Sequence, residues 1–514
     1  MTTGDAPHGG ILALLEELWN WIYERIGQEM AKDFEMKKFF IVFDLGMAFI
    51  RGMIRDNVMA KGLNSINNRD FREWLAYHGA TDISLNSVLV KTVYDSCFAY
   101  YKGDPGVPNL EAGVALRISL SIALCGKGHW LWKMNAGMGD TIFSPFYRFL
   151  KNHVKFEFFH KVKELKLADD NSTERYVSEI IIERQVTLKD EYKELGYNPV
   201  ITVKGLDCWP SEPGYEQLVE GEELIQLKNA GKNVNLESMW NSWPGCRNPA
   251  EREITLRLCN DTGEGDFDIV LLGIPIAAHF HICPDLIQNN PRWYSMINRV
   301  VTNQTYSSQL WMSKDTEKLG WNYNAKILTG FVEPIDTWSD MTHLIKMENW
   351  DEDNTPANLT YLVSAYPEEA AIPLFYHHRF PARENQVGCE ATIEFLKQNI
   401  RQIYPDAIVN GEFDWEMLFD ILDKKGEDRF KSQYCIINTE HSERYTLSVR
   451  GSSSYRLRAD ESGYNNLFFC GDWTDNGMNA GCVEASVISG MRAAAAISKK
   501  QIKVVGDNGI FQMT

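Results

Sequence analysis

The chain has 514 residues, which is enough for two or three domains of roughly 100–200 residues each. Hydrophobic residues make up 44% and charged residues 24%, as is ordinary for a soluble globular protein with a sizeable core. The formal net charge of −18 gives an acidic surface that repels phosphate backbones, so we do not expect nucleic acid as the partner.

Cysteine usage and targeting signals indicate a cytoplasmic protein. The ten cysteines are widely spaced and several stand in apolar runs, which predicts buried, reduced thiols rather than a disulfide framework. The start, MTTGDAPHGG, has neither the basic nor the apolar region of a signal peptide. The most apolar stretch, Phe39–Ile54, is interrupted by Asp44 and Arg51 and falls short of the ~20 clean residues of a membrane span. Peripheral contact with a lipid substrate pool stays open.

The first quarter of the chain is predicted to be almost entirely helical. Apolar residues recur at helical spacing in four stretches, at 11–30, roughly 35–60, 84–101 and 109–126. Asp70 or Asn68 is a candidate cap for a further short helix that Gly79 ends. This quarter contains no glycine-rich turn from a strand into a helix.

The pattern changes at Trp132. A glycine-containing turn at Gly137 and Gly139 precedes a predicted helix over about 140–152. The run VKFEFFH, residues 154–160, alternates apolar and polar side chains and predicts a strand. Further strands are predicted at KVKELKL, YVSEIIIER and YNPVITV.

The middle of the chain mixes strands and helices. FDIVLLGIPI is apolar enough to be buried on both faces of a parallel sheet. HFHIC, with His279, His281 and Cys283, alternates like a strand end, and no further zinc ligands cluster with it. The other predicted elements are the strands ITLRLCN, TYSSQLWM and ANLTYLVSAYP and the helices PDLIQNNPRWYSMINRVV and EATIEFLKQNIRQIYP.

The tail has the clearest architecture. YNNLFFCGDWT is an apolar strand that ends in Gly471 and Asp472. NAGCVEASVISGMRAAAAISKK is a helix of small residues that closes on two lysines, which suit a helix C-terminus. A strand, a Gly-Asp turn and such a helix pack tightly on a parallel sheet.

These tail residues resemble the C-terminal flavin-binding segment of the flavin amine oxidase and phytoene desaturase superfamily. The resemblance runs through Gly471, Asp472, Trp473, Thr474 and Gly477 and then Glu484, Ala485, Ser486, Val487, Ser489 and Gly490. Ala485 and Ser486 replace the Gly and Ala that the family carries there. A second block, MNAGMGDTIFSPFYRFLKNHVKFEFFHKVKEL, is similar to the adenine side of the same superfamily, so the resemblance covers roughly residues 130–500.

The resemblance implies an FAD cofactor and its contacts. Asp472 would accept hydrogen bonds from the ribityl hydroxyls, and the N–H groups of Gly481–Val483 would face the flavin pyrimidine at a helix start. The backbone near Val162 would contact the adenine. The cofactor-binding candidates are Gly137, Met138, Gly139, Val162, Gly471, Asp472, Gly481, Cys482, Val483 and Glu484.

The resemblance also implies hydride removal from a C–H bond by an oxidase, a dehydrogenase or a desaturase. Amine oxidases commonly carry an aromatic residue where this chain has Gly481–Val483, and a lysine in a strand where TYSSQLWM offers Ser307, Ser308 and Gln309. These departures favour an apolar or an amino-acid- or amine-derived substrate over that of a plain amine oxidase. The catalytic candidates are Trp473, Gln309 and Tyr306, with Trp311, His377 and His378 as further pocket candidates and no metal site.

The GxGxxG fingerprint that normally opens such proteins is missing from these residues. Gly137-x-Gly139 lacks the third glycine and opens no βαβ unit. Three explanations are open: a partner polypeptide carries the fingerprint segment, the chain binds flavin in a shortened form or as a homo-oligomer, or the chain is a flavin-less subunit. The strand YNNLFFC is built for a sheet buried on both faces, which favours the partner.

We therefore predict an α/β fold with a Rossmann-like FAD-binding sheet that is incomplete in this chain. The expected divisions are a helical substrate cap (1–130), the adenine side of the FAD domain (131–205), a mixed α+β substrate domain (206–450), a C-terminal FAD segment (451–500) and a tail (501–514). The predicted function is a subunit of a FAD-dependent oxidoreductase. The alternative is a non-catalytic structural subunit that stabilises a partner flavoenzyme.

Overall fold

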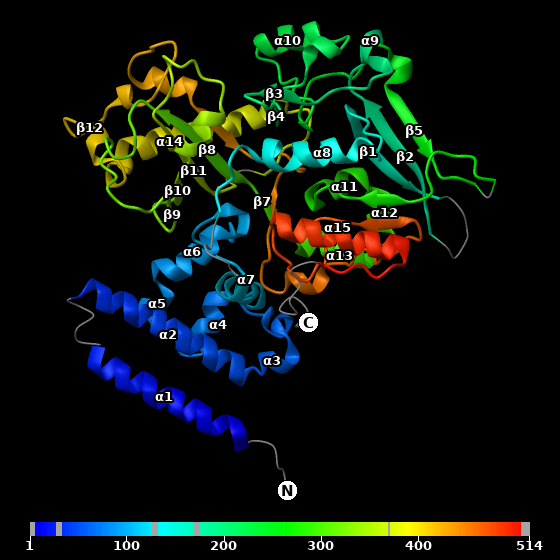
Figure 1. Ribbon diagram of the computed structural model, residues 1–514. Coiled ribbons are helices and arrows are strands. Elements are labelled where there is room, and N and C mark those ends of the chain that lie inside the picture. The colour runs from blue at the N-terminus through cyan, green and yellow to red at the C-terminus, as the bar shows by residue number, and fades with distance from the viewer. Residues whose placement is uncertain are drawn as a thin grey trace.

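The computed structural model describes residues 6–26, 33–125, 132–168, 175–260, 262–368 and 371–504. These residues form a mixed α/β structure with several small sheets. Figure 1 shows three parts: a helical N-terminal region, a part around a five-stranded sheet, and a part that joins a three-stranded sheet to the C-terminal helix.

The N-terminal region is helical, as predicted. Its helices are α1 (Ala6–Ile26), α2 (Phe34–Arg55), α3 (Val58–Lys61), α4 (Phe71–Tyr77), α5 (Asp82–Leu85), α6 (Val88–Ser96) and α7 (Ala112–Cys125). Asp70 caps α4 as expected, because its carboxylate accepts the N–H groups of Arg72 and Glu73. The single helix predicted over 84–101 is wrong. The chain there forms α5 and α6 and then turns at Phe98, whose φ is 47°.

A three-stranded antiparallel sheet follows α8 (Ser144–Leu150). Its strands, in the order β1-β2-β5, are β1 (His160–Leu167), β2 (Val177–Arg184) and β5 (Glu253–Arg257). The strand predicted over 154–160 is wrong, since β1 begins only at His160. Phe159 has a φ of 59°, and this left-handed residue breaks the extended run that the alternation indicated.

The segment inserted between β2 and β5 forms a small unit with its own hydrophobic core. It contains α9 (Asp190–Lys193), β3 (Ile201–Val203), β4 (Leu206–Cys208) and α10 (Gly221–Asn229). A separate core beneath them gathers Val186, Leu218, Leu224, Val234 and Trp243. The boundary expected at residue 206 lies inside this unit, and β5 beyond it returns to the sheet of β1 and β2.

The largest sheet has five antiparallel strands in the order β14-β8-β11-β10-β9. They are β8 (Thr305–Met312), β9 (Ile327–Leu328), β10 (Thr337–Asp340), β11 (Asn358–Ala365) and β14 (Tyr434–Ile437). The long helix α14 (Phe380–Gln398) packs against β14, and two short pairs lie outside the sheet: β7 (Thr302–Asn303) with β15 (Tyr445–Thr446), and β12 (Ile408–Val409) with β13 (Glu412–Phe413). The strands predicted at TYSSQLWM and ANLTYLVSAYP are confirmed as β8 and β11.

The tail forms the expected strand, turn and helix. β16 (Leu467–Phe469) pairs in parallel with β6 (Val270–Leu272), and α15 (Val483–Ser498) packs on β16. Three helices complete this part: α11 (His279–Ile282), α12 (Pro284–Gln288) and α13 (Pro291–Arg299). HFHIC is therefore a helix and not the end of a strand. β6 and β16 are the two parallel-paired strands in the described part of the chain, so the larger Rossmann-like sheet stays a prediction.

The burial predicted for FDIVLLGIPI is wrong on one face. Val270 and Leu272 are buried, but Ile269 and Leu271 are 46% and 49% exposed. Successive side chains of a strand point to opposite faces, so Ile269 and Leu271 share the face of β6 that the described residues leave partly uncovered.

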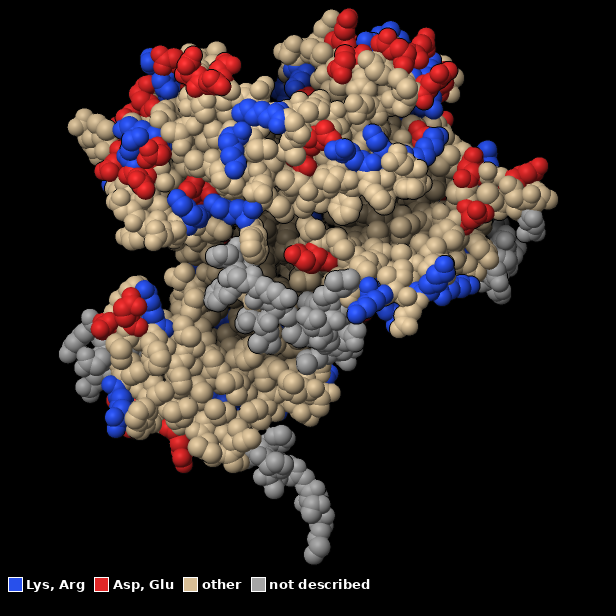
Figure 2. Space-filling model, in the orientation of Figure 1, with Lys and Arg blue, Asp and Glu red and all other residues tan. Residues whose placement is uncertain are grey.

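The molecular surface shown in Figure 2 carries scattered acidic and basic side chains. The face between α8 and α15 is hollowed, and most of the surface around the hollow is uncharged. Among the described helices, none combines the length and the apolar character that crossing a membrane requires.

Candidate flavin site

The turn after β16 fixes the strand end to α15. Gly471 has a φ of +147°, and a Cβ at this position would lie 2.3 Å from Nε1 of Trp473. The N–H of Gly471 donates to Oγ of Ser489 on α15 over 2.7 Å. Oγ of Ser489 in turn donates to the carbonyl of Ser486 over 2.7 Å. Glycine is therefore required here by both backbone conformation and space.

Asp472 lies just beyond the carboxyl end of β16, in the turn that leads toward α15. Its Oδ1 accepts a long hydrogen bond of 3.3 Å from the Thr446 hydroxyl. Its backbone carbonyl is bound more firmly, by Arg456 at 2.5 Å and by the Asn476 amide at 3.1 Å. Burial raises the pKa of the Asp472 carboxyl, and the nearby Arg456 charge opposes this shift. A carboxylate in this state can accept hydroxyl donors from a ligand.

The start of α15 presents backbone N–H groups without a side-chain cap. Cys482 is the N-cap residue, with extended φ of −160°, and its side chain makes no capping bond. Gly481 before it is tightly enclosed, since a Cβ there would lie 2.7 Å from Cζ of Tyr445 and 2.8 Å from the Thr446 carbonyl. The first N–H groups of this 16-residue helix therefore form a positive dipole end suited to an anion or a partial negative charge.

Two arginines, Arg456 and Arg117, are buried near acidic residues of the turn after β16. Arg456 is 4% exposed and donates to Ser448 and the Leu447 carbonyl as well as to Asp472. Arg117, on α7, is fully buried and donates to the Asn64 side chain over 3.0 Å. Burial lowers the pKa of Arg117 to about 10, although Asp475 and Glu111 oppose that effect. The carboxylates of Glu111 and Asp475 act on both guanidinium groups and offset their positive charge.

The groups around the turn fit a flavin, because several donors have no acceptor in the described structure. Nε1 of Trp473, Nε of Arg456, and Nε and Nη1 of Arg117 are buried without a hydrogen-bond partner there. A buried donor left unpaired costs about 1–3 kcal/mol, so a polar ligand that reached these atoms would be stabilised. Tight glycines, an accepting carboxylate and a free helix start are the parts that a flavin tail needs.

Comparison with known proteins agrees with this geometry. Residues 427–498, which include β14, β15, β16 and α15, match the family model described as flavin containing amine oxidoreductase. This segment of the chain is similar to that family. The family resemblance predicted from Gly471–Asp472 and the following helix is thereby confirmed.

The other comparisons add little to this amine-oxidase-like assignment. The structure of an oxidoreductase from Methanosarcina mazei is 15% identical over 45% of this chain and 43% of its own length, with a TM-score of 0.26. The chain therefore spans less than half the length of that structure. A search of curated proteins finds no match.

The adenine-side candidates Gly139 and Val162 pack against different parts of the fold. Gly139 packs against Trp209, where a Cβ would approach Cβ of Trp209 to 3.1 Å, and Asp140 accepts the N–H of Trp209 over 2.9 Å. Met138 between the glycines Gly137 and Gly139 is 43% exposed. Val162, on β1, packs against the same core as β16 and Trp473. Sequence reasoning could not find the Trp209 contact, because the two segments are far apart in the chain.

The catalytic candidates are not brought together. Trp473 is 1% exposed in the core beneath β16, and its ring centroid lies 4.7 Å from that of His279. Tyr306 is fully buried in the core of the five-stranded sheet, where its hydroxyl bonds to Thr392. Gln309 is half-buried on β8, opposite strands β11 and β14. The two aromatic candidates therefore belong to separate cores of the described structure.

The remaining pocket candidates are also dispersed. Nε1 of Trp311 donates to the Glu348 carboxylate over 3.0 Å. His377 and His378 are exposed, and Nδ1 of His378 lies 2.8 Å from the Trp240 carbonyl. None of these contacts places the three side chains beside Gly471–Asp472.

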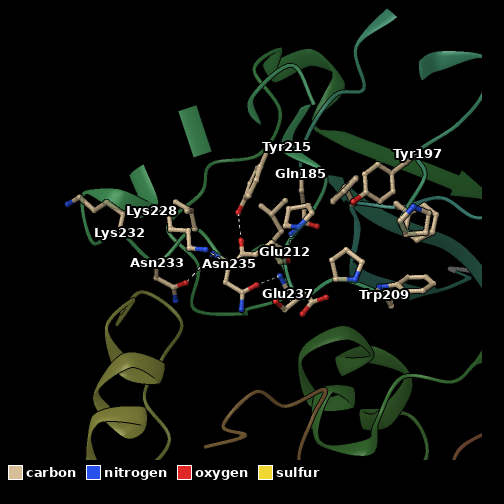
Figure 3. Close-up of a pocket in the computed structure, with 18 residues that line it drawn as sticks. Gln185, Tyr197, Trp209, Glu212, Tyr215, Lys228, Lys232, Asn233, Asn235 and Glu237 are labelled. Atoms are coloured by element: carbon tan, nitrogen blue, oxygen red, sulfur yellow. Dashed lines mark hydrogen bonds and ion pairs between the residues drawn. The ribbon is translucent and has the colours of Figure 1, made fainter. Parts of the chain in front are cut away.

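The structure shows a cavity that the sequence did not suggest. It has a volume of about 440 Å³ and lies beside the inserted unit (Figure 3). Aromatic side chains form much of its wall, namely Phe158, Phe159, Tyr197, Trp209 and Tyr215. Glu212 at its edge accepts the Tyr215 hydroxyl over 2.6 Å and pairs with Lys228. The turn WPSEP was the available signal, since Trp209, Pro210, Glu212 and Pro213 all line the cavity.

Proposed function

We propose that this chain is a subunit of a FAD-dependent oxidoreductase that removes hydride from a C–H bond of a small molecule. A partner polypeptide supplies the GxGxxG segment that the 514 residues lack. The observation that carries the proposal is the unit of β16, the Gly471–Asp472 turn and α15, because its geometry and its family match agree. The flavin, when bound, supplies the hydride-accepting chemistry.

The residues of this chain would hold and polarise the cofactor. Asp472 accepts hydroxyl donors at the end of β16, and the uncapped N–H groups of α15 favour negative charge in front of the helix. Arg456 donates to the backbone carbonyl of Asp472 and so holds the turn in place. Together these groups stabilise an electron-rich ligand more than a neutral one.

The substrate side differs from that of a plain amine oxidase. Gly481–Val483 provide no aromatic wall before α15, and β8 carries Ser307, Ser308 and Gln309 rather than a lysine. We infer a largely apolar or an amino-acid- or amine-derived substrate, taken by an oxidase, dehydrogenase or desaturase.

The competing function is a structural subunit that stabilises a partner flavoenzyme without taking part in the chemistry. The burial of Trp473 and Tyr306 in two separate cores favours this alternative, because neither ring is open to a substrate. The two functions differ in one measurable property, which is whether the assembly containing this chain holds flavin through Asp472.

The decisive experiment compares Asp472→Ala with Asp460→Ala. Asp460 is an exposed aspartate of the same segment, paired with Arg458, and serves as the matched control. The chain is purified from its source cells with whatever it binds, and released FAD is measured by absorbance and chromatography. We expect Asp472→Ala to lower FAD per chain several-fold with unchanged circular dichroism, and Asp460→Ala to keep the wild-type content. Equal FAD content in both variants, or an assembly that stays colourless with added FAD, would support the structural alternative.

A further inference from the structure

The inserted unit between β2 and β5 holds the wall of the 440 Å³ cavity in a fixed shape. Phe159, Tyr197 and Tyr215 line the cavity and also pack against the unit's own core. The N–H of Gln185 donates to the Phe159 carbonyl over 2.8 Å, and this bond ties the residue after β2 to the left-handed residue before β1. The cavity is therefore built before any ligand arrives, as is usual for small-molecule sites.

The aromatic rings of the wall form one connected group. The ring centroid of Phe158 lies 5.2 Å from that of Tyr197 and 6.2 Å from that of Trp209. All three side chains are only partly buried, so part of each ring is open to the cavity. Aromatic faces attract cations as well as apolar groups, because the face of the ring is the negative part of its quadrupole.

The charged groups of the wall leave one carboxylate unmatched. Glu212 is matched, since it accepts the Tyr215 hydroxyl over 2.6 Å and pairs with Lys228. Lys232, the other base of the wall, extends away from the aromatic rings in Figure 3. Glu237 forms no ion pair within the described part of the chain. The charge that a ligand would meet without a counter-ion is therefore negative.

Two buried groups strengthen the preference for a positive N–H donor. Burial raises the pKa of the Glu440 carboxyl, and the charge of Glu237 adds to this rise while Lys161 opposes it, so the field around Glu237 is acidic. Gln185 is 6% exposed, and its Nε2 donates to the carbonyl of Leu236, the residue before Glu237, over 2.6 Å. Its Oε1 has no donor among the described residues and can accept an N–H from a ligand.

We propose that this cavity binds a protonated primary or secondary amine with an apolar or aromatic body. The body lies against the connected aromatic rings, and the ammonium group donates to the Glu237 carboxylate and to Oε1 of Gln185. A quaternary ammonium would fit less well, because it has no N–H for the glutamine oxygen. None of the residues of the wall belongs to the turn after β16 or to α15, so this inference does not rest on the proposed function.

Isothermal titration calorimetry of the full chain at neutral pH tests the chemistry of the ligand. The probes are phenethylammonium, phenethyl alcohol and hydrocinnamate, which share an arylalkyl body and are positive, neutral and negative. We expect the ammonium probe to bind at a single site and the other two to bind about tenfold more weakly or less. Equal affinities, tighter binding of the anion or no binding of the ammonium probe would overturn the proposal. Displacement of that probe by adenosine would assign the cavity to the cofactor and overturn it as well.

Substitutions then locate the bound amine. Glu237→Gln should weaken the binding of phenethylammonium about tenfold, whereas Glu222→Gln, at an exposed position of α10 outside the wall, should bind like the wild type. Trp209→Leu should also weaken binding, and Trp209→Phe, which keeps a ring, should lose less. If Trp209→Leu alters the circular dichroism, Glu237→Gln and its control decide alone.

The variant Asp472→Ala separates this cavity from the flavin site. It should keep the wild-type affinity for phenethylammonium whether or not it loses FAD, so the proposed function and the amine site can fail independently. Weaker amine binding in Asp472→Ala, wild-type affinity in Glu237→Gln, or equal losses in Glu237→Gln and Glu222→Gln would contradict the amine site.

Discussion

Replacing Gly471 by alanine should destabilise the tail because the turn after β16 has no room for a Cβ. The added atom would lie 2.3 Å from Nε1 and 2.7 Å from Cδ1 of Trp473, distances that real Cβ atoms do not show. The indole is 1% exposed and packed against Phe469 and His279, so it cannot simply move outward. The backbone would therefore shift and strain the N–H bond to Ser489.

The size of the effect follows from two contributions. A residue with a Cβ at a φ of +147° carries backbone strain of about 1–3 kcal/mol. Overpacking of a close-packed core adds about 1–3 kcal/mol. Gly471→Ala should thus lower the free energy of unfolding by about 2–6 kcal/mol.

Gly490 on α15 provides the matched control. A Cβ there would meet nothing within 4 Å, and the residue is helical, so Gly490→Ala should be neutral or stabilise by about 0.5–1 kcal/mol. Urea unfolding followed by tryptophan fluorescence compares the two variants with the wild type. An unfolding free energy for Gly471→Ala within about 0.5 kcal/mol of the wild type would refute the reasoning about the turn.

Two further predictions concern the same part of the protein. Ser489→Ala leaves the N–H of Gly471 without its acceptor and should cost about 1–3 kcal/mol in urea unfolding. Ser486→Ala, which loses a 3.4 Å bond on an exposed side chain, should change stability by less than about 0.5 kcal/mol, and equal losses would contradict the assignment. Burial lowers the pKa of His279 to about 4, below its ordinary 6.5. Between pH 4 and pH 6.5 the unfolded chain therefore binds more protons at this histidine than the folded chain does, and the free energy of unfolding falls as the pH drops. From pH 7 to pH 5 the loss should be about 2 kcal/mol more in the wild type than in His279→Gln. His377→Gln, at an exposed site, should keep the wild-type pH dependence, and an unchanged slope in His279→Gln would count against a buried neutral imidazole.

Local sequence signals predicted most helices and strands whose stabilising contacts are local. Asp70 caps α4 through N–H groups two and three residues later, which a sequence pattern records. The strand predicted over 154–160 was wrong because the left-handed conformation of Phe159 ends the extended chain. An alternating pattern of apolar and polar residues does not reveal that conformation. The burial predicted for β6 was wrong on one face, because exposure at Leu271 depends on whether another part of the chain covers that face, which the apolar run itself does not record.

The sequence predicted some parts of the candidate site and not others. Gly471, Asp472 and the start of α15 are adjacent in sequence, so their composition and spacing were enough to indicate a flavin segment. Trp473 and Tyr306 were judged by residue type alone, and the structure buries them in different cores. The sequence does not predict the cavity at Trp209, because its wall comes from residues between 158 and 237 that only folding brings together.

The sequence by itself determined that the tail is an amine-oxidase-like strand, turn and helix, and that a GxGxxG segment is not among these residues. Both are local properties of a few neighbouring residues. Only the tertiary structure decided that β6 is the strand beside β16, because strand pairing joins residues about 200 positions apart through backbone groups that carry no sequence signature.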